Sequence, residues 1–61
     1  MVSSQEVRQV LNESGITQKR CSELVGIPEQ YLSEFLNNKR ELESDHKIRL
    51  ADYIEKIKTI I

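Results

Sequence analysis

The chain has 61 residues, with nine Lys and Arg against ten Asp and Glu, so its formal net charge at pH 7 is −1. A chain of about 60 residues buries only roughly 60% of its unfolded surface, which leaves room for one small core and excludes a deep enzyme pocket. Its hydrophobic content of 38% is too high for a disordered tail, and its short apolar runs exclude a transmembrane helix. We therefore expect one domain over residues 1–61.

Cysteine and histidine usage predicts no metal, no cofactor and no catalysis. Cys21 is the one cysteine, so no intramolecular disulfide can form, and its place on an apolar stripe predicts a buried structural thiol. His46 stands alone, and we expect it on the solvated surface. No nucleophile is paired with a base, and no glycine-rich phosphate loop is present. Without a visible signal peptide, the chain is predicted to be cytoplasmic.

The spacing of apolar residues predicts four helices and no strand, which makes the fold all-α. The first helix is expected over about residues 3–13. Ser3 and Glu6 have the spacing of a capping box, in which a hydroxyl and a carboxylate each accept a hydrogen bond from a backbone N–H. Gly15 is expected to end the helix. The apolar stripe consists of Val7, Val10 and Leu11.

The second helix is expected over about residues 18–25, between Thr17 as N-cap and Gly26 as the residue that ends it. Ile16 precedes the cap and Cys21 occupies the fourth helical position, which is the spacing of a hydrophobic staple. The apolar stripe consists of Cys21, Leu24 and Val25.

The third helix is expected over about residues 28–37, because Pro28 is tolerated at a helix start and the pair Asn37–Asn38 suits a helix end. The fourth helix is expected over about residues 44–60. The inward residues are Leu32, Phe35 and Leu36 in the third helix and Leu50, Ala51, Ile54, Ile57 and Ile61 in the fourth, with Ile48 and Tyr53 beside them.

The connection between the second and third helices points to a function. Gly26 and Ile27 form a turn so short that the two helices cannot lie antiparallel and must cross steeply, as in a helix-turn-helix. Ser22 is small where the two helices approach, and the flanking positions are apolar. A helix-turn-helix unit is therefore predicted over about residues 17–38.

The segment from Thr17 to Gly26 and the run EQYLSEFLNNK at 29–39 resemble the lambda-repressor-like (Cro/C1, or XRE) helix-turn-helix DNA-binding domains. The resemblance covers about residues 5–55 and implies a small bundle of four helices, or five. It implies double-stranded DNA as the partner, with the third helix in the major groove. Many members have a fifth helix, whereas one uninterrupted last helix is predicted here. Leu11 and Leu36 match positions that form an Arg–Glu pair in many members, so an apolar contact is expected instead.

The resemblance also implies which residues touch DNA. Gln30 can bond adenine through two atoms, Glu29 or Glu34 can accept from cytosine N4, and Tyr31 can lie against a thymine methyl or a phosphate. Glutamates at the surface also repel phosphate, so their role as readers stays open against an ordinary solvated one. The base contacts implied are Glu29, Gln30, Tyr31, Ser33 and Glu34. The phosphate contacts implied are Gln18, Lys19, Arg20, Asn37, Lys39 and Arg40.

The charge distribution fits this interpretation better than the total charge does. Residues 17–40 carry four basic against three acidic side chains, whereas residues 1–16 and 41–49 are each net negative. A monomer with three or four phosphate contacts should bind DNA weakly, so a second copy or a partner regulator is expected. A dimer contact is predicted at the end of the last helix, where a flexible chain end is the alternative. The residues proposed for it are Ile57, Ile60 and Ile61, of which Ile57 also fits the monomer core.

Two functions follow from these features. The first is a sequence-specific DNA-binding transcriptional regulator, a small Cro-type repressor of phage, plasmid or bacterial origin that occupies an operator and blocks polymerase. The second is a protein-interaction module on the same fold, such as an antitoxin, an antirepressor or an adaptor. The near-neutral charge and the two glutamates of the third helix favour the second.

Overall fold

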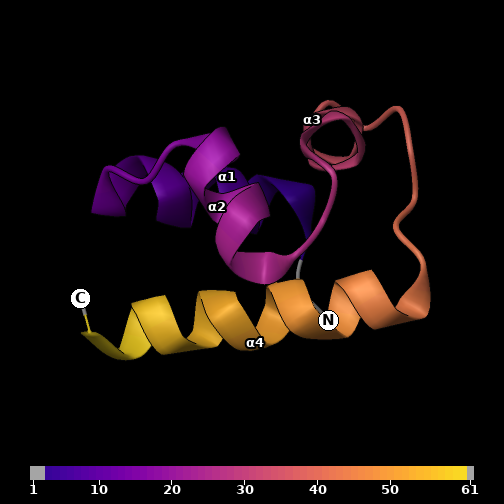
Figure 1. The fold of residues 1–61 in the computed structure, drawn as a ribbon. Helices are drawn as coiled ribbons and strands as arrows, with labels where there is room; N and C mark the ends of the chain where they lie inside the picture. Colours follow the sequence, from indigo (N-terminus) through magenta and orange to yellow (C-terminus); the bar gives the residue numbers. More distant parts are fainter. Residues whose placement is uncertain (1–2, 61) are drawn as a thin grey trace.

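The structure is a computed structural model that describes residues 3–60, and within this range it consists of helices without any strand. The all-α prediction is therefore confirmed. Figure 1 shows one long helix, α4, along one side of the molecule. The helices α1 and α2 pack against α4, and α3 packs against α1 and α2 farther from it. The four elements are α1 (Ser4–Ser14), α2 (Gln18–Val25), α3 (Glu29–Leu36) and α4 (Ser44–Ile60).

The helix ends follow from local hydrogen bonds that the sequence predicts. The hydroxyls of Ser3 and Thr17 each accept a hydrogen bond from the backbone N–H three residues on, at 3.2 and 3.1 Å. Gly15 and Gly26 end α1 and α2 with φ angles of 74° and 84°, and Asn38 follows α3 with a φ of 61°. Glycine and asparagine enter this left-handed region at the least cost, so these residues stop the helices.

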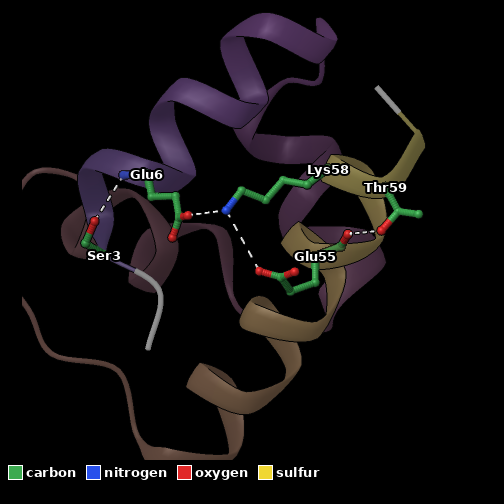
Figure 2. A network of polar contacts seen from close by, with 5 residues as sticks. All are labelled: Ser3, Glu6, Glu55, Lys58 and Thr59. Carbon is green, nitrogen blue, oxygen red and sulfur yellow. Dashed lines mark hydrogen bonds and ion pairs between the residues drawn. The ribbon is translucent and has the colours of Figure 1, made fainter.

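Two predicted details of the helix starts are wrong. Pro28 is the N-cap of α3 and not its first helical residue, with extended backbone angles of −55° and 135°. The carboxylate of Glu6, expected to bond the backbone of Ser3, instead accepts a hydrogen bond from Lys58 near the end of α4 (Figure 2). The ammonium of Lys58 also lies 3.8 Å from a carboxylate oxygen of Glu55. This group of charges links the first turn of α1 to the last turn of α4.

The core lies between the four helices and matches most of the predicted stripes. Cys21 is fully buried, and burial raises the pKa of its thiol to about 11, so it is a neutral packing residue as predicted. Leu11 and Leu36 are both buried, in line with the expected apolar contact. Arg8 extends alongside and donates a hydrogen bond to the Leu36 carbonyl at 3.5 Å. The buried apolar residues are Val7, Val10, Leu11, Cys21, Val25, Ile27, Leu32, Leu36, Leu42, Leu50, Ile54 and Ile57.

Three apolar residues depart from the predicted stripes. Leu24 is 52% exposed because the buried face of α2 is centred between Cys21 and Val25. Ile48 is 69% exposed, since it lies on the side of α4 that faces away from α1 and α2. Leu42 is buried although it belongs to the segment between α3 and α4, for which no core residue was predicted. Ile61, predicted on the inward stripe of α4, lies outside the described residues.

Candidate nucleic-acid interface

The connection between α2 and α3 holds these helices in a helix-turn-helix. It comprises residues 26–28, and Ile27 is buried while its N–H donates to the carbonyl of Ser22 at 3.1 Å. A Cβ on Gly26 would lie 3.3 Å from a guanidinium nitrogen of Arg49, so the turn also passes close to α4. With Leu32 fully buried, the opposite side of α3 is left in solvent.

The outer face of α3 carries three of the predicted base-reading residues. Gln30 and Tyr31 are exposed and Glu34 is half-buried. Helical spacing places Gln30 and Glu34 opposite Leu32, and Tyr31 beside Glu34 on one side of this face. Glu29 is exposed at the first residue of the helix. The remaining predicted reader, Ser33, is half-buried at the margin of this face.

Arg40 lies on this outer face, which the sequence did not predict. Its Nε donates a hydrogen bond to Oε1 of Glu34 at 2.6 Å, and its guanidinium carbon lies 4.1 Å from the centroid of the Tyr31 ring. The hydrogen bond from Arg40 holds the pKa of the Glu34 carboxyl below its usual range. Arg40 therefore joins Glu34 and Tyr31 into one connected group on this face, next to the exposed Gln30.

The turn after α3 explains how Arg40 reaches back. With Asn38 in the left-handed region, the Lys39 N–H donates to the Glu34 carbonyl at 2.8 Å, which reverses the chain direction. Asn38 is also held by α1, because its side-chain oxygen accepts a hydrogen bond from the Ser4 hydroxyl at 2.7 Å. These bonds fix the path of the turn so that the side chain of Arg40 lies against α3.

The predicted phosphate-contact residues flank α3 on two sides. Gln18, Lys19 and Arg20 are exposed in the first turn of α2, and Gln18 lines a hollow together with Leu36 at the end of α3. Lys39 is exposed beyond α3, and it makes no ion pair with the described residues, as is also true of Lys19 and Arg20.

Asn37 differs from these basic residues, since its side-chain amide nitrogen donates to the Ser33 carbonyl at 2.8 Å and so caps the end of α3. Its amide oxygen and the second hydrogen of its amide nitrogen are left for other partners. Its predicted phosphate contact stays a prediction.

One residue predicted on the solvated surface, His46, is less exposed than expected. The side chain of His46 is only 14% exposed, so the prediction of a solvated histidine is wrong. It lies 3.4 Å from a carboxylate oxygen of Glu43, in a groove that Tyr31 and Arg40 also line, because buried Leu42 draws the α3–α4 connection inward.

The predicted dimer contact at the end of α4 is only partly available. Ile57 is 7% exposed and belongs to the monomer core, so its side chain offers no dimer contact. Ile60 is 83% exposed, and Ile61 lies outside the described residues.

The described part of the chain contains no helix that is long and apolar enough to cross a membrane. Among the same residues, no group of three or more His, Cys, Asp and Glu side chains is placed to hold a metal ion.

Comparison with known proteins identifies the family. The helix-turn-helix family HTH_3 matches residues 7–57, which include α2, the turn, α3 and most of α1 and α4. No curated protein and no solved structure matches the chain significantly. The matched segment coincides with the four-helix fold and with the resemblance noted in the sequence. The chain therefore belongs to the Cro/C1-type helix-turn-helix family of DNA-binding regulators.

Proposed function

We propose that this protein is a sequence-specific transcriptional regulator that reads the DNA major groove with α3, in the manner of a small Cro-type repressor. One observation carries the proposal: the solvent face of α3 presents Gln30, Tyr31 and Glu34, and basic side chains without ion-pair partners among residues 3–60 flank it. An α-helix fits the major groove, where polar side chains can distinguish the four base pairs. Occupying an operator would then block polymerase.

Within this proposal the roles divide between bases and backbone. Gln30 pairs with adenine, Glu34 or Glu29 accepts from cytosine N4, and Tyr31 covers a thymine methyl. Ser33, at the margin of the face, contacts a base edge at the side of the groove. The backbone contacts set the register of the protein on the duplex and come from Gln18, Lys19, Arg20, Asn37 and Lys39.

Selection of bound sequences from random duplex DNA tests the proposal. We expect one short motif to be enriched and the affinity for it to fall as salt rises, because each phosphate contact releases counterions. If no sequence is enriched and no salt-dependent binding is seen, the proposed function is wrong.

Lys39→Ala should weaken binding to every DNA sequence alike and leave the selected motif unchanged. Removing one phosphate contact should reduce the slope of log affinity against log salt by about 0.9. The measurement is fluorescence anisotropy with the selected duplex and a scrambled one across a salt series. Lys56→Ala is the matched control, because it removes the same charge from the exposed side of α4. An equal change of slope in both variants would contradict the assignment of Lys39.

We further propose that two copies associate through the end of α4, which would double the contacts to a repeated half-site. The exposure of Ile60 supports this, and Ile60→Ser should then shift the protein toward monomer in sedimentation equilibrium. Ile48→Ser is the control, since Ile48 is an exposed isoleucine near the other end of the same helix. A monomeric wild-type protein, or the same result for both variants, would remove the dimer proposal.

A protein-interaction module, such as an antitoxin, an antirepressor or an adaptor binding a partner regulator, is the second candidate. The net charge of −1 and the exposed Glu29 at the start of α3 favour it. The selection experiment separates the two, because a module that binds only protein would enrich no DNA sequence.

A further inference from the structure

The outer face of α3 has an acidic group at its centre. Glu34 lies between Gln30 and Tyr31 on this face, and its side chain is 34% exposed. An unpaired carboxylate there would repel the DNA backbone and could adopt several rotamers, which would make it a poor base reader. A reader at this position therefore needs a group that cancels its charge and holds its orientation.

Arg40 has the geometry to do both. The edge of its guanidinium bonds Glu34 at 2.6 Å while the face of the same group covers the Tyr31 ring, 4.1 Å from the centroid. A planar guanidinium can bond a carboxylate along its edge and stack on an aromatic ring with its face at the same time. One side chain thus links two predicted readers.

The contacts also leave a reading atom available. Arg40 bonds Oε1 of Glu34, so the other oxygen, Oε2, is left to accept a hydrogen bond from a base. Lys39, the adjacent residue, has the same charge but no ion pair among residues 3–60. Lys39 and Arg40 therefore differ in their surroundings although they are adjacent and carry the same charge.

We propose that Arg40 is a specificity-determining positioning residue, which orients Glu34 and Tyr31 to read bases, and not a contact to a DNA phosphate. This role rests on the proposed DNA-binding function. It divides the two cations after α3: Lys39 contributes affinity for any duplex, and Arg40 contributes sequence preference through the residues it holds.

A double-mutant cycle tests the role of Arg40. Arg40→Ala, Glu34→Gln and the double variant are measured on the motif selected with the wild-type protein. If Arg40 acts through Glu34, Arg40→Ala should lower affinity about tenfold with Glu34 present and less than about twofold in the Glu34→Gln background. A direct phosphate contact would instead give equal losses in both backgrounds and a salt slope lower by about 0.9. That result would overturn the inference.

Sequence preference is a second measurement, and the loss of a positive charge by itself should not change it. Repeating the selection with Arg40→Ala and with Glu34→Gln should relax preference at the same base pair, whereas Lys39→Ala should relax none. Arg40→Lys keeps the charge but lacks the planar fork, so it should keep the salt slope and still relax that base pair. Full preference in Arg40→Lys would mean that charge alone suffices, and the positioning role would be wrong.

The free protein gives a control that does not depend on DNA. In an NMR titration, Arg40→Ala should move the pKa of Glu34 up toward its usual value, since the hydrogen bond from Arg40 holds it down. An unchanged pKa would show that the pair does not form in solution, and the inference would fail. Wild-type protein without sequence-dependent binding would contradict the proposed function itself, whereas wild-type binding with equal losses in the cycle would contradict only the role of Arg40.

Discussion

Leu32→Ala is expected to destabilise this protein by about 2–5 kcal/mol, because truncating a buried leucine loses transfer free energy and leaves a cavity. Leu32 has 0% exposure and is among the largest fully buried side chains. A single core in a chain of this size rarely supplies more than about 3–5 kcal/mol of stability, so the variant should be largely unfolded at room temperature. Urea and thermal unfolding followed by circular dichroism would measure the loss.

Leu24→Ala is the matched control for this prediction. It makes the same substitution in the neighbouring helix, at a leucine that is 52% exposed. Because alanine is at least as good a helix former as leucine, the free energy of unfolding should change by less than about 0.5 kcal/mol. Similar losses in the two variants would mean that α3 does not pack as described. Binding of Leu32→Ala to DNA should fall with its folded fraction.

Gln30→Ala should have the largest effect on recognition. A side-chain amide that bonds adenine through two atoms contributes about 1–3 kcal/mol of discrimination, so affinity for the selected motif should fall by about fivefold to 150-fold. The loss should be confined to one base pair, and affinity for unrelated duplexes should change little. Selection from random DNA, followed by anisotropy on single-base variants, would locate that base pair.

Gln30→Ala should leave the stability of the fold unchanged, because Gln30 is exposed and alanine favours the helix. A change in binding can therefore be assigned to the lost side chain. Gln5→Ala serves as control, since Gln5 is an exposed glutamine on α1. An unchanged motif after Gln30→Ala would remove this residue from the reading surface. It would leave the family assignment intact, because the assignment rests on residues 7–57 as a whole.

Most of the fold could be predicted because its signals are local. The caps at Ser3 and Thr17 and the left-handed residues Gly15 and Gly26 act within a few residues of the chain, so their sequence spacing is enough to place the helix ends. The apolar stripes were predicted less accurately at their margins. Leu24 has the spacing of a core residue, but which side of an eight-residue helix is buried depends on the helices packed against it.

The candidate site shows the same limit. The resemblance to the family named Gln30, Tyr31 and Glu34 as readers, and the period of the helix explains why these three share one side of it. Helical spacing does not predict the contact of Arg40 with Glu34, since the two residues are six apart in the sequence and a non-helical turn lies between them. The bond between Glu6 and Lys58 joins opposite ends of the described chain and is equally invisible to spacing.

A small, near-neutral, all-α domain with a helix-turn-helix was therefore determined by the sequence alone, through length, apolar period and capping residues. Only the tertiary structure decided which of the two cations after α3 lies on the outer face of that helix. Arg40 and Lys39 are adjacent and equally charged, and composition gives no reason to separate them. The left-handed turn at Asn38 and its bond to Ser4 direct Arg40 onto α3. Lys39 makes no ion pair within residues 3–60. Their difference comes from the path of the backbone in three dimensions, which local spacing does not encode.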